Sequence, residues 1–164
     1  MKLIIILSVL LIALLTPIFG QMFYPKHKVV KKYHFMMFKA NWHKALLHCR
    51  SLGMNLVSIS SKEENEQVIQ KIKDEGYAGS VFWTSGTKLG DNVTWEWAGN
   101  GKRVTFTNWA PGEPNNHGDD ENCILSSESV WGPNSTQKWN DDTCDYECPF
   151  ICEQDVFEYE YCSN

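Results

Sequence analysis

Six cysteines constrain the fold of this 164-residue chain more than any other feature of its sequence. All of them follow residue 20: Cys49, Cys123, Cys144, Cys148, Cys152 and Cys162. In a short exported chain such a set indicates a disulfide framework, although spacing alone leaves many pairings open. A zinc site at residues 144–152 is the competing interpretation. Oxidising export disfavours it, and no second cluster of Cys or His lies nearby in the sequence.

The first 20 residues have the pattern of a secretory signal peptide. Lys2 gives a short positive region, residues 3–15 are almost wholly apolar, and Gly20 is a small residue suited to cleavage before Gln21. An uncleaved anchor is the alternative, but a spanning helix needs about 20 apolar residues. We therefore expect residues 1–20 to be a signal peptide, the protein to be secreted, and the mature chain to lack a membrane span.

Charge and motif content exclude two classes of function. The chain has a formal net charge of −5, and acidic residues dominate from Glu113 onward. Nucleic-acid binding requires a basic face that displaces counterions, so we expect no nucleic-acid partner. No Ser-His-Asp or Cys-His arrangement is evident in the sequence, so we expect no enzymatic activity.

Hydrophobic periodicity predicts two helices in the first half of the chain. The first covers residues 42–52 behind Asn41 as a cap, and its apolar face is Trp42, Ala45, Leu46, Cys49 and Leu52. The second runs to Asp74 from a capping box that starts at either Ser60 or Ser61. Its buried stripe is Val68, Ile69 and Ile72.

Short strands and one long loop are predicted in the remainder. The strands lie near residues 32–38, 56–59, 81–83, 94–97, 123–125, 138–139 and 149–152. Residues 98–118 form a loop rich in Gly, Asn and Pro, and loops of this length tend to be functional or disordered. Two helices followed by a disulfide-stapled, loop-rich sheet region indicate an α+β domain.

Oxygen-bearing side chains are concentrated in and after this loop. They form three clusters: Glu113 with Asn115, then Glu121, then Asn140 with Asp141. Ca²⁺ prefers carboxylate and amide oxygens and takes about six to eight ligands. The five side chains can supply most of that shell and leave positions for two hydroxyls of a ligand. The sequence therefore predicts a calcium-dependent sugar binder.

Taken together, the chain resembles the C-type lectin-like domain family over about residues 32–153. The resemblance rests on Glu113-Pro114-Asn115, Glu121 and Trp139-Asn140-Asp141, on Cys49 in the first helix, and on Trp83-Thr84-Ser85-Gly86, Asn108-Trp109 and Phe150-Ile151-Cys152-Glu153. It implies an α+β fold with two helices, small antiparallel sheets and a long calcium-binding loop. It also implies that the lectin domain covers residues 32–153, which leaves residues 21–31 as a short lead-in and 154–164 as a C-terminal tail.

The resemblance also implies roles for individual residues. It implies the disulfides Cys49–Cys152 and Cys123–Cys144, and a cis peptide at Pro114. It implies that both Ca²⁺ and carbohydrate are bound by Glu113, Asn115, Glu121, Asn140 and Asp141. In this family, Glu before and Asn after the proline goes with sugars that have equatorial 3- and 4-hydroxyls, such as mannose, fucose and N-acetylglucosamine. The order Gln-Pro-Asp goes with galactose.

Two points stay open in the sequence. Cys148 and Cys162 either bond to each other or link chains into a homodimer or hetero-oligomer. The positions that carry the acids of a neighbouring second calcium site in the family are here Thr87, Asn116 and Asn122, and Asp91 is the main acid left. We therefore expect one functional Ca²⁺, with the second site weak or absent.

The remaining candidates are peripheral. Asn92 and Asn134 begin sequons and are predicted glycosylation sites. His117 is either a rim residue that contacts a sugar or an exposed loop residue. The function that the resemblance implies is a secreted mannose-type lectin of innate immunity that recognises glycans on microbes or cells. The alternative is a protein-binding module of the same fold that has no essential sugar ligand.

Overall fold

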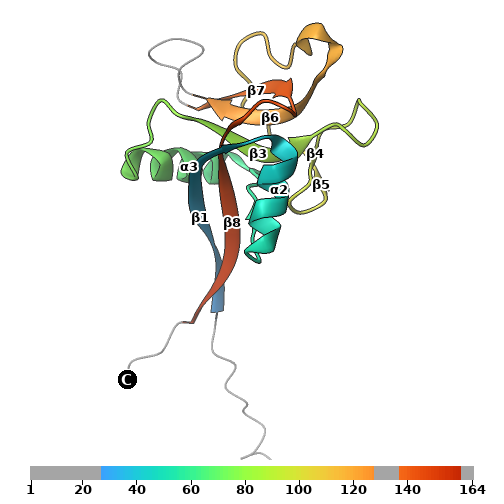
Figure 1. Cartoon of the computed structure of the whole chain (residues 1–164). Helices are drawn as coiled ribbons and strands as arrows, with labels where there is room; N and C mark the ends of the chain where they lie inside the picture. Colours follow the sequence, from blue (N-terminus) through green and yellow to red (C-terminus); the bar gives the residue numbers. More distant parts are fainter. Residues whose placement is uncertain (1–26, 128–136, 160–164) are drawn as a thin grey trace, which may run out of the picture. The chain divides into compact units, whose positions relative to one another are not determined.

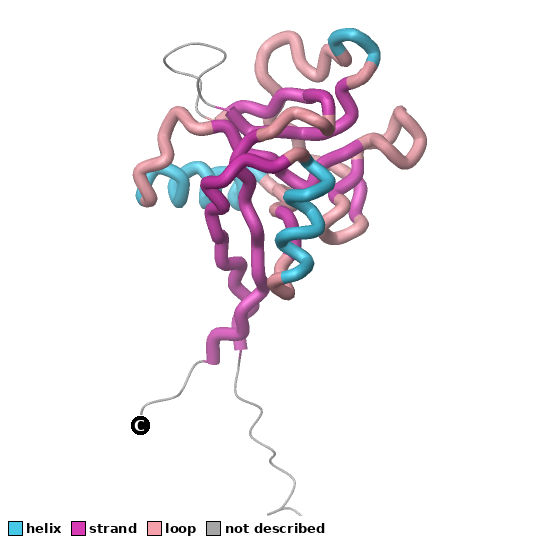
Figure 2. The backbone as a smooth tube through the Cα atoms, in the orientation of Figure 1, coloured by secondary structure: helices cyan, strands magenta, loops and turns pink. Residues whose placement is uncertain are grey.

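The structure, a computed structural model, describes residues 27–127 and 137–159 (Figures 1 and 2). The expected signal peptide, Cys162 and Asn134 lie outside these residues. The chain divides into two compact units, and the larger one comprises Lys31–Val156. In the smaller unit, the ring of His27 contacts those of Phe157 and Tyr159, with centroids 5.4 and 6.0 Å away.

The described residues form one sheet of eight strands. Its main path runs in the order β1 (His27–Ala40), β8 (Cys148–Tyr159), β3 (Val81–Thr87), β4 (Glu96–Trp97) and β5 (Lys102–Arg103). The short β2 (Asn55–Leu56) pairs with β8, while β6 (Glu121–Ser127) pairs with β3 and with β7 (Lys138–Thr143). The strands β3 and β8 are parallel, which makes the sheet mixed rather than purely antiparallel.

Two α-helices accompany this sheet in the described part of the chain: α2 (Trp42–Ser51) and α3 (Lys62–Asp74). Together with the mixed sheet they confirm the predicted α+β class (Figure 2). One 3-10 turn, η1 (His117–Asp119), lies in the long loop before β6. In Figure 1 this loop lies beside β6 and β7 at one end of the larger unit.

Side-chain caps fix where both helices begin. The Oδ1 of Asn41 accepts the amide of Lys44 at 2.9 Å at the start of α2. At α3 the register that starts at Ser61 is used, and its Oγ accepts the amide of Glu64 at 3.2 Å. The prediction for Leu52 is wrong, because α2 ends at Ser51 and Leu52 is 51% exposed. Past the last turn, helical periodicity no longer points a side chain at the core.

The core has two halves because both faces of β3 are covered. Phe82 and Trp83 are neighbours whose side chains point to opposite faces of the strand, and both are completely buried. Trp83 packs among residues that include Cys49 and Cys152. Phe82 packs in a second cluster whose other members are Val57, Ile59, Val68, Ile72, Trp97, Ile124, Trp139 and Ile151.

The structure contains the two disulfides that the resemblance implies. Cys49–Cys152 joins α2 to β8 across 103 residues, and Cys123–Cys144 joins β6 to the segment after β7 across 21 residues. Cys148 is buried, and this burial raises the pKa of its thiol to about 12. Because Cys162 lies outside the described residues, its pairing with Cys148 stays a prediction.

The first and last strands of the chain, β1 and β8, are longer than the sequence predicts. β1 begins at His27, inside the expected lead-in, and β8 continues to Tyr159, inside the expected tail. The two strands are hydrogen-bonded neighbours, so each one extends the other. No helix among the described residues has the length and apolar character needed to cross a membrane.

Candidate functional site

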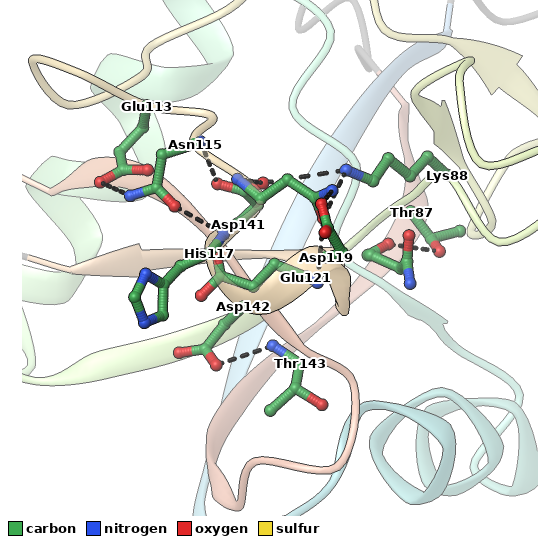
Figure 3. Close-up of polar contacts among 12 residues, drawn as sticks. Thr87, Lys88, Glu113, Asn115, His117, Asp119, Glu121, Asp141, Asp142 and Thr143 are labelled. Carbon is green, nitrogen blue, oxygen red and sulfur yellow. Dashed lines mark hydrogen bonds and ion pairs between the residues drawn. The ribbon is translucent and has the colours of Figure 1, made fainter.

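Asp141 anchors the long loop to the sheet. It lies in β7 opposite Ile124 of β6, and it is completely buried. Its Oδ1 accepts the backbone amide of Asn115 and its Oδ2 that of Asn116, both at 3.0 Å (Figure 3). One buried carboxylate therefore holds two consecutive loop amides. Hydrogen bonds to a charged acceptor are stronger than those between neutral groups.

A chain of hydrogen bonds brings Glu113, Asn115 and Glu121 together. The peptide between Glu113 and Pro114 is cis. The Nδ2 of Asn115 donates to Oε1 of Glu113 at 3.0 Å (Figure 3). The backbone amide of His117 then donates to both Oδ1 of Asn115, at 2.8 Å, and Oε2 of Glu121, at 2.7 Å. Glu113 and Asn115 are thus bonded directly, Glu121 is connected to them through the amide of His117, and Asp141 accepts the amide of Asn115.

The fifth predicted ligand is connected less directly. Asn140 precedes Asp141 in β7, opposite Leu125, and is half-buried. Within residues 27–127 and 137–159, no side-chain hydrogen bond links Asn140 to the other four ligands. Its role as a ligand therefore stays a prediction.

Burial and neighbouring negative charge raise the pKa of Glu113 and of Glu121. Burial, followed by the charge of Asp141, raises the pKa of Glu113 above its ordinary value of 4.5. Burial also raises the pKa of Glu121, with additional effects from Asp141 and Asp142 and an opposing hydrogen bond from the His117 amide. Negative charge accumulated here is unfavourable without a cation, so these groups would gain from one.

The donor set fits a hard cation. Oε2 of Glu113 is buried and has no hydrogen-bond partner among the described residues, and a buried unpaired carboxylate oxygen is costly. In the described part of the chain, no three His, Cys, Asp or Glu side chains gather closely enough to hold a metal on their own. A calcium site here would therefore combine carboxylates with amide oxygens, drawn from Glu113, Asn115, Glu121, Asn140 and Asp141.

Sequence reasoning missed Lys88, which lies directly after β3. Its side chain is only 10% exposed, and its Nζ donates to Oδ1 of Asn116 at 3.2 Å (Figure 3). The same nitrogen lies 3.9 Å from Oδ2 of Asp141 and 5.0 Å from the ring centroid of Trp95. No local sequence pattern distinguishes this lysine from an exposed one, because its partners come from three separate segments.

The positions of the expected weak second calcium site are engaged within the protein. The hydroxyl of Thr87 donates to the carbonyl oxygen of Asn122 at 2.8 Å. Oδ1 of Asn116 accepts from both Lys88 and the backbone amide of Glu121, the latter at 3.2 Å. A hydroxyl and two amides carry no negative charge to attract a further divalent ion.

The aromatic residues near the site divide into rim and core. His117 is exposed, and its contacts to the site come from its backbone amide. Trp139 is completely buried, and half-buried Trp109 packs against it with ring centroids 5.8 Å apart. Asn92 is exposed in the turn after Lys88, and its glycosylation stays a prediction.

Comparison with known proteins identifies the class of this chain. Residues 38–154 match the Lectin C-type domain model, so the chain belongs to the C-type lectin family, a family of non-enzymatic domains whose members include carbohydrate-recognition domains. This confirms the resemblance found in the sequence.

Two relatives and one solved structure illustrate the family. The C-type lectin mosGCTL-7 of Aedes aegypti is 32% identical over 127 residues, which cover 76% of this chain and 83% of that protein. The hepatic lectin of Gallus gallus is 33% identical over 123 residues, 74% of this chain and 54% of that protein. The C-type carbohydrate-recognition domain of cow CD23, solved in the presence of a GlcNAc2Man3 oligosaccharide, is 27% identical with a TM-score of 0.64. That match covers 80% of this chain and 90% of the cow domain.

Proposed function

We propose that this chain is a secreted, calcium-dependent lectin for sugars with equatorial 3- and 4-hydroxyls, of the mannose type, and that it recognises glycans on microbes or cells. The observation that carries the proposal is the unpartnered, buried Oε2 of Glu113, next to Asn115 and near the charge of Asp141. The cow CD23 domain, solved in the presence of a mannose-containing oligosaccharide, supports the same class of ligand.

In this proposal the five residues Glu113, Asn115, Glu121, Asn140 and Asp141 hold the metal. Bound Ca²⁺ would supply coordination positions for two neighbouring sugar hydroxyls. The carboxylates of Glu113 and Glu121 accept hydrogen bonds from these hydroxyls, and the amides of Asn115 and Asn140 donate to them. Asp141 keeps the loop on the sheet, so the loop side chains are held in place before the ligand arrives.

The experiment is binding of the purified mature protein to mannose and galactose resins, each with Ca²⁺ and with EDTA. We expect retention on mannose that EDTA abolishes. A single site of this kind binds a monosaccharide at about millimolar strength, so a densely substituted resin is required. The double variant Glu113→Gln with Asn115→Asp should weaken mannose binding or redirect it toward galactose.

The matched control is Glu96→Gln, which makes the same chemical change on an exposed glutamate of β4 that is not one of the five proposed ligands. It should bind as the wild type does. If neither resin retains the wild-type protein although both disulfides are intact, the sugar site is rejected. The protein-binding alternative then takes first place.

A further inference from the structure

We propose that Lys88 is a built-in cation that positions Asp141 and Asn116, so that the loop keeps its shape without metal, and that its charge excludes a second divalent ion beside Asp141. The exclusion of a second ion rests on the proposed calcium site. The positioning role does not, because it concerns contacts that the chain makes by itself.

The burial of Lys88 requires an explanation. The residue is 9% exposed, and lysines are almost never buried this far unless they are paired. Its Nζ has an amide oxygen at 3.2 Å and a carboxylate oxygen at 3.9 Å, from Asn116 and Asp141 respectively. Both partners belong to the part of the structure that holds the loop against β7.

Asp141 needs this cation. It is completely buried, and a buried carboxylate without a compensating charge is strongly unfavourable. The amides of Asn115 and Asn116 satisfy its oxygens, but they carry only partial charge. The ammonium of Lys88 supplies the full positive charge, and it lies on the side of Oδ2.

The backbone and an aromatic ring fix the position of Lys88 independently of any metal. Its amide donates to the carbonyl oxygen of Asn122 at 3.0 Å, which ties it to β6. Its ammonium lies over the ring of Trp95, where a cation is attracted to the π face. That ring contacts Trp109, with centroids 5.4 Å apart, and Trp109 packs on the buried Trp139. The cation is therefore attached to the core.

Amide hydrogen exchange in EDTA tests the positioning role. In the wild type we expect the amides of Asn115 and Asn116 to be protected without Ca²⁺. Lys88→Met should make them exchange about tenfold faster or more, because the charge that holds their acceptor is lost. Lys88→Arg should restore protection, because it restores the charge. Adding Ca²⁺ should protect these amides far more in Lys88→Met than in the wild type.

Two controls separate this effect from general loss of structure. Lys102→Met removes an exposed lysine from β5 and should exchange as the wild type does. The amide of Ser85, which donates to the carbonyl oxygen of Val57 at 2.8 Å, should keep its protection in every variant. If Lys88→Met does not fold, Lys88→Gln, which keeps a donor but has no charge, decides the same question.

Unchanged exchange in the neutral variant, or an arginine variant as unprotected as the methionine variant, would overturn the positioning role. The exclusion of a second divalent ion is tested by calorimetric titration with Ca²⁺, where we expect one ion per wild-type chain. Two ions per chain would overturn the exclusion. If no Ca²⁺ binds at all, the proposed function fails, whereas the exchange data in EDTA still decide the role of Lys88.

Discussion

At the scale of single residues, acid–base chemistry governs the site. Glu113, Glu121 and Asp141 must be ionised to hold a metal, and protons compete for the same oxygens. In Glu113 and Glu121, burial and neighbouring carboxylates raise the pKa above 4.5. Protonation therefore begins at a higher pH than for an isolated glutamate, which makes the site sensitive to mild acid.

We expect Ca²⁺ affinity to fall as the pH is lowered, with the loss beginning above pH 4.5, the ordinary pKa of these groups. The affinity falls in this direction because a raised pKa increases the fraction of Glu113 and Glu121 that is protonated at a given pH, and the protonated groups do not bind metal. Calcium titrations at a series of pH values measure the effect, and sugar retention should decline in parallel. Constant affinity down to about pH 4 would contradict the ligand set.

At the scale of elements, one lysine ties three segments of the larger unit together. In β1, Lys31 lies 2.9 Å from Oε1 of Glu64 in α3 and 2.9 Å from Oε2 of Glu153 in β8, and it donates to the carbonyl oxygen of Ser58 at 3.1 Å. Burial alone would lower the pKa of Lys31, but its carboxylate partners raise it overall. Glu153 is 5% exposed and depends on this cation.

Lys31→Met should lower the free energy of unfolding by about 2–4 kcal/mol, because it leaves a buried carboxylate unpaired. The range lies below that of a fully buried pair, since Lys31 keeps some contact with water. Urea denaturation measures the change. Adding Glu153→Gln should recover part of the loss. Lys62→Met, which breaks an exposed pair with Glu66, should cost about 0.5 kcal/mol or less. A double variant as unstable as Lys31→Met alone would refute this account.

At the scale of the whole molecule, the two disulfides differ in the length of chain that they close. Cys49–Cys152 spans 103 residues and Cys123–Cys144 spans 21. A crosslink restricts the unfolded chain more when its loop is longer. The long disulfide should therefore contribute more to global stability, and the short one should act mainly on β6, β7 and the site.

Replacing Cys49 and Cys152 by alanine should cost about 4–5 kcal/mol of unfolding free energy, and replacing Cys123 and Cys144 about 3 kcal/mol. Thermal or urea unfolding of the two double variants measures the difference. We also expect the second variant to lose Ca²⁺ affinity before it loses its fold. Equal costs would show that loop length does not determine the contribution of these crosslinks.

Local and distant interactions explain what the sequence could predict. The cap at Asn41 and the buried Val68 and Ile72 depend on nearby residues or on helical period, and the sequence predicts them. For the second cap the sequence left Ser60 and Ser61 open, and the structure uses Ser61. Glu113, Asn115 and Glu121 lie within nine residues of one another in the sequence, and this closeness predicts that they share a site. Lys88 was missed because nothing near it in the sequence indicates burial.

The lengths of β1 and β8 and the role of Asp141 in holding the loop depend on residues far apart in the sequence, so the sequence did not predict them. Asp141 accepts amides 26 and 25 residues away, and only the folded β6–β7 pair brings them within reach. The extra length of β1 and β8 arises because each strand hydrogen-bonds to the other. Pairing between the beginning and the end of a chain leaves no local signal at either strand.

The 103-residue span of Cys49–Cys152 has a consequence for how the folded chain responds to a protease. A single backbone cut in any loop between these two cysteines leaves two fragments that stay covalently joined. The broken ends can remain packed in the same sheet, so a nicked molecule can keep its site. Such a molecule would migrate as one band on a denaturing gel and separate into two only after reduction.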